Sequence, residues 1–125
     1  QKGSKVAILS TGTIGNNVTK ALAETENSSL FSHYHFPFVK PLDIEEISKI
    51  IDSHDYIITV EDGVITGGFG EQINSIVVRQ HLQKPIKNLG ISDSFIEHGT
   101  VFELQQICKI DVTNLIQLFN TFSHD

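Results

Sequence analysis

The chain has 125 residues, of which 39% are hydrophobic, and a formal net charge of −6. This length supports one domain with one core. The negative charge and the single arginine, Arg79, disfavour nucleic acid as a partner, because phosphates are held by clustered lysine and arginine. No apolar run approaches the ~18 residues that a membrane-spanning helix needs. The single cysteine, Cys108, excludes a disulfide within the chain and fits a reducing compartment such as the cytoplasm.

Strands and helices alternate along the first half of the chain. Residues 5–10 are a short apolar run before a glycine-containing turn, which predicts a buried strand. Residues 16–26 have the periodicity of a helix, and residues 31–38 predict a second strand that runs into an edge or a loop. Residues 43–46 have the spacing of a capping box, which predicts that the next helix begins there.

The second half repeats this alternation. Residues 56–60 are the clearest strand, and a glycine-rich loop over residues 63–70 leads into an amphipathic helix. Residues 86–91 predict a further strand. A second capping-box candidate at residues 100–103 and a candidate cap at Asp111 precede the last helical segments. Alternating strands and helices predict an α/β fold, a layer sandwich around a mostly parallel sheet with right-handed crossovers.

The glycine-rich loop is the most distinctive segment, and two interpretations of it are open. An acidic pair, Glu61 and Asp62, ends the preceding strand, and glycines then lead into a helix. This is where ligands of open α/β sheets bind, and helix N-termini attract anions, so a phosphate cradle is one interpretation. The other is a tight turn or interface loop, in which Gly67, Gly68 and Gly70 supply positive φ and close packing. The second is favoured, because the motif lacks the P-loop lysine and the carboxylates would repel phosphate.

We expect this loop to form a contact surface toward a partner domain or subunit. Phe69 could anchor that contact, or it could pack inward beneath its own helix with Ile73. Replacing Gly68 by valine should then damage assembly, because a β-branched residue cannot easily take the positive φ expected there. The interface candidates are Glu61, Asp62, Gly67, Gly68, Phe69, Gly70, Glu71 and His98.

Two smaller motifs carry weaker signals. Gly12 and Gly15 are half of a dinucleotide fingerprint, but no acidic residue ends the second strand as that fingerprint requires. His33 and His35 lie two apart on one face of a strand and could contribute to a metal site. No third ligand is marked by the sequence, so partly exposed strand histidines are the favoured interpretation.

No convincing catalytic constellation can be identified from the residues alone. Glu97 and His98 are a carboxylate–imidazole pair, but neighbours on an extended chain point apart and no nucleophile is marked beside them. Cys108 lies in a helical pattern and is predicted to be a small core residue.

Four stretches, residues 5–12, 40–43, 58–70 and 89–100, resemble the C-terminal domain of the 1-deoxy-D-xylulose-5-phosphate synthase family of the transketolase superfamily. The last stretch, Gly-Ile-Ser-Asp-Ser-Phe-Ile-Glu-His-Gly-Thr, distinguishes this family from its relatives. The chain has Ser92 where the family usually has proline, which affects only the rigidity of a loop.

The resemblance implies a fold and a function. The fold would be a three-layer α/β/α sandwich, and its mostly parallel sheet would have five strands, one of them antiparallel. The parent enzyme would be a cytoplasmic transferase that condenses pyruvate with glyceraldehyde 3-phosphate and releases carbon dioxide, on the route to isoprenoids, thiamine and pyridoxal. Thiamine diphosphate and magnesium would be held by preceding domains, so no catalytic, cofactor-binding or metal residue is expected in this chain.

Residues 1–125 would then be the C-terminal domain of a longer enzyme, an expectation that the start at Gln1 and the lack of methionine support. Its partners would be the other domains and a second subunit of a homodimer. The alternatives are the C-terminal domain of a transketolase or of a 2-oxoacid dehydrogenase beta subunit, and a free-standing regulatory module of the same fold.

Overall fold

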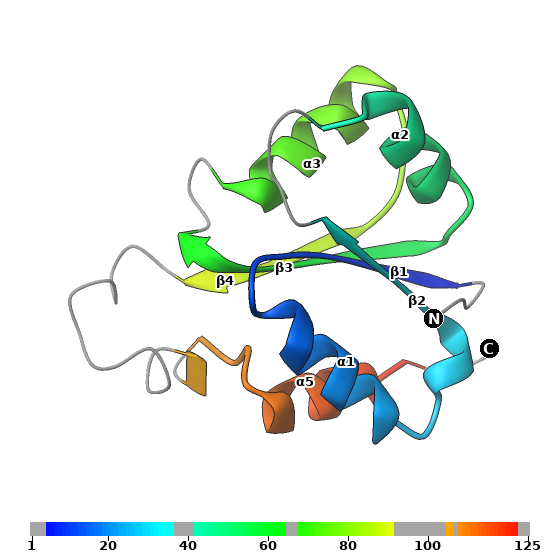
Figure 1. Cartoon of the computed structure of the whole chain (residues 1–125). Coiled ribbons are helices and arrows are strands. Elements are labelled where there is room, and N and C mark those ends of the chain that lie inside the picture. Colours follow the sequence, from blue (N-terminus) through cyan, green and yellow to red (C-terminus); the bar gives the residue numbers. More distant parts are fainter. Residues whose placement is uncertain (1–4, 37–41, 65–67, 92–104, 107, 123–125) are drawn as a thin grey trace.

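The computed structural model is a three-layer α/β/α sandwich (Figure 1) and describes residues 5–36, 42–64, 68–91, 105–106 and 108–122. One parallel sheet lies between α1 and α5 on one face and α2 and α3 on the other. Within the described ranges, no helix is long and apolar enough to cross a bilayer. The elements are β1 (Val6–Thr11), α1 (Gly15–Ala23), the short 3-10 helix η1 (Ser28–Leu30), β2 (Phe31–Phe36), α2 (Ile44–Asp52), β3 (Tyr56–Val64), α3 (Phe69–Arg79), β4 (Ile86–Ile91) and α5 (Val112–Phe119).

The sheet has the strand order β2-β1-β3-β4, and its described strand pairs are all parallel. The chain passes from β1 to β2 at one edge of the sheet and then crosses to β3 and β4 on the other side of β1. The strand order therefore reverses between β1 and β3. The carboxyl ends of these two strands meet there, with Thr11 opposite Glu61. In open α/β sheets this switch point is the usual place for a ligand.

The α/β/α sandwich and its four strands confirm the sequence-based expectation. β1 is shifted by one residue, β2 ends earlier than predicted, β3 extends beyond the predicted end and β4 has the predicted bounds. The fifth, antiparallel strand that the resemblance implied is not among the described residues. Asp43 caps α2 as expected: its side chain accepts a hydrogen bond from the Glu46 amide at 3.0 Å. Asp111 precedes α5 but makes no side-chain cap bond, because its carboxylate accepts from the Asn114 side chain instead.

Both faces of the sheet are buried, which explains why β1 is apolar almost throughout. Successive side chains of a strand point to opposite faces. Val6 and Ile8 therefore belong to the core on the α1 and α5 side, and Ala7 and Leu9 to the core on the α2 and α3 side.

The α1 and α5 side holds a cluster of aromatic rings. Phe31 lies 5.1 Å from Phe119 and 5.7 Å from Phe122 between ring centroids, and Phe122 also packs edge-on against Tyr56. Phe119 is a buried member of this core, and the partly buried Phe122 packs against it. Such ring pairs attach the last helix to the sheet.

Candidate functional site

Two polar clusters lie at the carboxyl ends of the strands, one on each face of the sheet. Glu61 of β3 and the start of α3 form the first cluster. Ser10 of β1 with His33 and His35 of β2 forms the second, on the face covered by α1. Both flank the switch point between β1 and β3, so this edge of the sheet is the candidate site.

Glu61 caps α3 from the end of the neighbouring strand. Its side chain is only 3% exposed, and its two carboxylate oxygens accept the amides of Phe69 at 3.0 Å and Gly70 at 2.9 Å. A carboxylate at a helix N-terminus satisfies amides that lack partners within the helix and complements the helix dipole. The chain's own carboxylate therefore occupies the position that a phosphate would take in a cradle formed by these amides.

Gly70 lets α3 approach the sheet closely, as the sequence predicted for this glycine. A Cβ atom there would lie 2.8 Å from both the Asn88 Nδ2 and the Thr59 Oγ1 atoms. These two groups are themselves hydrogen bonded at 2.7 Å, and Asn74 donates to Asn88 at 2.8 Å. The first turn of α3 is thus fixed over a polar network as well as by Glu61.

The predicted positive φ of Gly68 is wrong. Gly68 is the residue before α3 and has φ −90° and ψ −163°, an extended conformation that any residue adopts. The loss of assembly expected for Gly68→Val therefore has no support from backbone strain. Among the described glycines, positive φ occurs at Gly12, with φ 82°, in the turn after β1.

Phe69 packs inward, in agreement with the second of the two expectations for this residue. It is 1% exposed, lies 5.7 Å from Phe36 between ring centroids, and belongs to the same core cluster as Ile73. A side chain buried in the chain's own core cannot also anchor a partner, so the suggestion of Phe69 as a surface anchor is not supported.

The other interface candidates are only partly described. Glu71 is exposed on the first turn of α3, and Gly68 beside it is half-buried. The side chain of Asp62 lies outside the described part of the chain, as do Gly67 and the pair at residues 97–98. Cys108 packs against the α1 and α5 core as predicted, but it is only half-buried and lies in a turn instead of a helix.

The second cluster joins two histidines through one serine. The Ser10 hydroxyl lies 2.7 Å from His33 Nε2 and 2.9 Å from His35 Nδ1, and Ser10 itself is fully buried. The rings border a groove of about 520 Å³, whose other walls come from the turn after β1 and the first turns of α1: Gly12, Thr13, Gly15, Asn16 and Thr19. Within the described residues, no group of three or more histidine, cysteine, aspartate or glutamate side chains could hold a metal.

The turn after β1 does not form the phosphate loop that a dinucleotide site needs. The amides of Gly15, Asn16 and Asn17 each donate to a carbonyl three residues earlier, at 3.3, 3.0 and 2.9 Å. These are the amides that would face a pyrophosphate. The half fingerprint formed by Gly12 and Gly15 is therefore a structural turn.

His33 is neutral at physiological pH because its pKa is lowered. Burial, with a smaller contribution from the neighbouring His35, lowers its pKa from 6.5 to about 4. Its partner His35 is exposed. The cluster is therefore a pair of imidazoles, one held neutral at physiological pH, linked through a buried hydroxyl.

This pKa predicts an acid-sensitive stability. Because the unfolded chain binds a proton on His33 near pH 6.5 and the folded chain only near pH 4, stability is greatest above pH 6.5 and falls as the pH drops toward 4. The ring is partly exposed, so we expect a loss of about 1–2 kcal/mol across this range. His33→Gln can keep the bond to Ser10 without titrating. Urea unfolding at pH 7.5 and pH 4.5, with a chelator in the buffer, should show a smaller loss of stability for His33→Gln than for the parent chain. Equal losses would contradict the assignment of the acid sensitivity to His33.

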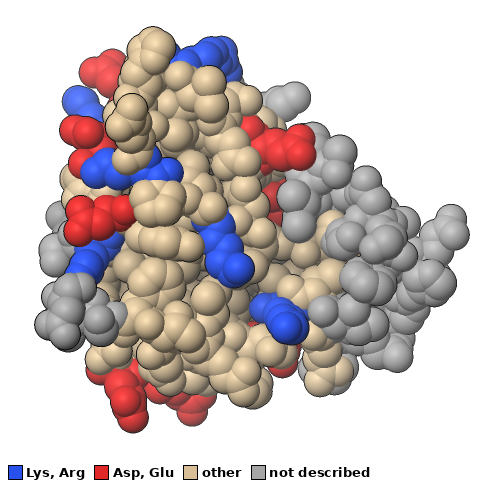
Figure 2. Space-filling model, turned by 180° about the vertical axis from the view of Figure 1, so that it is seen from behind, with Lys and Arg blue, Asp and Glu red and all other residues tan. Residues whose placement is uncertain are grey.

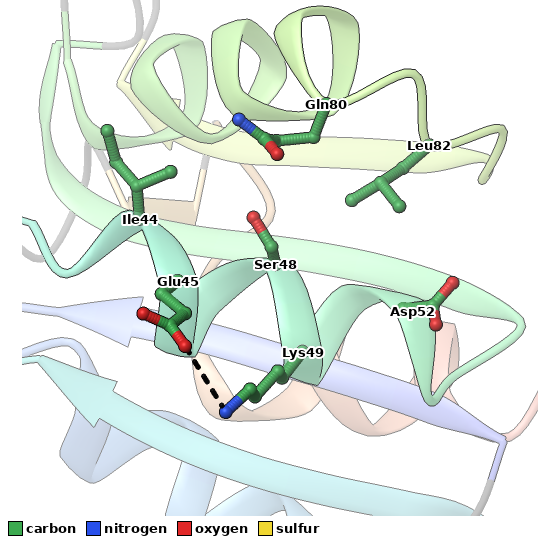
Figure 3. A pocket seen from close by; sticks show the side chains of 7 residues that line it. All are labelled: Ile44, Glu45, Ser48, Lys49, Asp52, Gln80 and Leu82. Carbon is green, nitrogen blue, oxygen red and sulfur yellow. Dashed lines mark ion pairs between the residues drawn. The ribbon is translucent and has the colours of Figure 1, made fainter.

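A second hollow lies away from this edge, between α2 and the end of α3 (Figure 3). It encloses about 580 Å³, and Ile44, Ser48 and Leu82 are among its walls. Lys49 and Glu45 pair at 3.5 Å along one rim, where both are strongly exposed. Such a surface ion pair contributes little free energy. Figure 2 shows acidic and basic side chains interspersed on the face opposite to that of Figure 1.

Sequence reasoning missed Ser10 and the capping role of Glu61. Ser10 follows an apolar run and belongs to no sequence motif, while its partners His33 and His35 lie 23 and 25 residues away. Glu61 was singled out for its position at the end of a strand. Its bonds to amides eight and nine residues later follow from the return of α3 over the sheet.

The chain is similar to known proteins along nearly its whole length. Residues 1–115 match the family "Transketolase, C-terminal domain". The chain is 37% identical over 115 residues to a 1-deoxy-D-xylulose-5-phosphate synthase of Bacteroides thetaiotaomicron, and 44% identical over 122 residues to one of Pseudoalteromonas translucida. These alignments cover 90% and 98% of the chain but only 18% and 19% of the two synthases.

A solved structure supports the same fold. "Split gene transketolase, inactive beta4 tetramer" superposes with a TM-score of 0.79 over 97% of this chain and 41% of that one, at 19% identity. The resemblance found in the sequence is thus confirmed. The chain belongs to the transketolase C-terminal domain family, and within that family it is similar to the corresponding part of 1-deoxy-D-xylulose-5-phosphate synthases.

Proposed function

We propose that residues 1–125 are one domain, the C-terminal domain of a thiamine-diphosphate-dependent 1-deoxy-D-xylulose-5-phosphate synthase that acts as a cytoplasmic homodimer. The whole enzyme would condense pyruvate with glyceraldehyde 3-phosphate, releasing carbon dioxide. The observation that carries this proposal is the similarity to such synthases over 90% and more of the chain, which spans about a fifth of their length.

The chemistry of the enzyme would belong to the other parts of the protein. When bound, thiamine diphosphate supplies the carbanion chemistry, with magnesium on its diphosphate. The described residues do not fit that group, because Glu61 already caps α3 and the amides of the turn before α1 bond within the chain. Magnesium prefers several oxygen ligands, and the described residues offer no acidic cluster for it. We therefore assign no step of the reaction to this chain.

The role of this domain would be to support assembly. Glu61 and Gly70 fix the start of α3 against the sheet, and this rigid end presents Glu71 to the surface. We propose that the surface around Gly68 and Glu71 contacts a neighbouring domain or the second subunit. Asp62, Gly67 and His98 remain candidates for the same surface.

A domain exchange tests the proposed function. The C-terminal segment of the Bacteroides thetaiotaomicron synthase would be replaced by this chain, and the turnover and dimerisation of the chimaera measured. We expect an active dimer, because 37% identity over the segment preserves the domain and much of its contacts. A control chimaera would carry the corresponding segment of the split-gene transketolase, which shares only the fold.

The outcomes separate the alternatives. A folded chimaera that dimerises but makes no product, or one no better than the control, would contradict the assignment to the synthase. Charge reversal by Glu71→Lys in the active chimaera should weaken dimerisation or domain packing more than Glu24→Lys. Glu24 is the C-cap residue of α1 and is also exposed. Equal effects of the two changes would argue against the proposed contact surface.

A further inference from the structure

The histidine pair has a hydrogen-bonding constraint that bears on what it can bind. A serine hydroxyl carries one hydrogen and accepts through its oxygen. Ser10 Oγ lies within 3 Å of both His33 Nε2 and His35 Nδ1, and the tautomer of each ring sets whether its nitrogen donates to this oxygen or accepts its hydrogen. A ring nitrogen that accepts from Ser10 already presents a lone pair, and one that donates presents a lone pair after a change of tautomer.

The geometry brings these two nitrogens together from adjacent positions on one face of β2. The rings are tilted by 73° with centroids 6.4 Å apart, and both flank the same oxygen. Gly15 leaves room for this arrangement, because a Cβ atom there would lie 2.6 Å from His35 Nδ1. His35 is exposed and borders the groove, so its ring can shift toward His33 without disturbing the core.

The surroundings also suit a metal ion rather than an anion. Neutral imidazoles are ligands for zinc, copper and nickel ions, and the groove leaves space for water to complete a coordination sphere. Thr13 and Asn16 add oxygen atoms to its walls, and no lysine or arginine is among the groove's lining residues.

We propose that His33 and His35 together bind one divalent transition-metal ion such as Zn²⁺ at this groove, with Ser10 as the residue that positions the two rings. The imidazole ligands suit a transition-metal ion rather than magnesium, which prefers oxygen ligands. Coordination at the two nitrogens replaces their hydrogen bonds to Ser10, whose hydroxyl then turns to the metal or to a bound water.

The proposal is tested by titrating the full 125-residue chain with Zn²⁺ in a calorimeter at pH 7.5. We expect one ion per chain, and affinity at least about tenfold weaker for His33→Gln and for His35→Asn, which keep an amide able to bond to Ser10. Gly15→Ala, which crowds His35 Nδ1, should also weaken binding. His81→Asn is the matched control, since His81 is an exposed histidine with φ 56° that asparagine tolerates, and it should bind as the parent does.

Nitrogen-15 NMR of the histidine rings identifies the ligands independently of affinity. Zn²⁺ should shift His33 Nε2 and His35 Nδ1 and leave His54 unchanged. Absence of saturable binding would overturn the proposal and leave the cluster as a self-satisfied hydrogen-bonded group. Binding that survives both histidine substitutions, or that shifts only other histidines, would also overturn it.

Discussion

Replacing Phe69 by alanine is expected to lower the free energy of unfolding by about 3–5 kcal/mol, the usual range for a fully buried phenylalanine. The ring is 1% exposed and packs against Phe36 within the core between the sheet and α3, so its removal leaves a cavity there. Urea unfolding followed by circular dichroism measures the change.

Val78→Ala on the same helix is the control, because Val78 is 73% exposed. We expect this change to alter stability by less than about 0.5 kcal/mol. If Phe69→Ala proved as mild as the control while it disrupted assembly of the longer enzyme, Phe69 would be an interface anchor after all, against its position in the core.

Replacing Glu61 by alanine is expected to cost about 2–4 kcal/mol of stability. The change removes a buried carboxylate that accepts two amides at the start of α3, and leaves those amides without an acceptor in a place shielded from water. Glu61→Gln should cost less, because one oxygen remains to accept one amide while the charge is lost.

Glu71→Ala serves as the comparison for Glu61, since Glu71 is an acidic residue in the first turn of the same helix but is exposed. An exposed acidic side chain near a helix N-terminus contributes little to stability, so the loss should stay below about 1 kcal/mol. A second measurement is hydrogen exchange of the Phe69 and Gly70 amides, which should speed up in Glu61→Ala and not in Glu71→Ala. Unchanged exchange in Glu61→Ala would show that the carboxylate does not cap this helix.

The order of strands and helices was determined by the sequence alone, because the signals involved are local. The apolar run before Ser10 and the one at residues 56–60 are too short for helices and end at turn residues. Asp43 and Glu46 specify the start of α2 through a contact that spans three residues. The family could also be identified from the sequence, since the motifs that indicate it are continuous stretches of the chain.

The chemistry of the candidate site was decided only by the tertiary structure. The parallel register sets Ser10 of β1 beside His35 of β2, and the crossover through α3 returns Gly70 to Glu61. Periodicity permitted Phe69 to face either way, and the burial of its ring against Phe36 from another strand settled the choice. Each of these pairs is joined by long-range packing, which no spacing along the chain encodes, because its partners meet only when the sheet has formed.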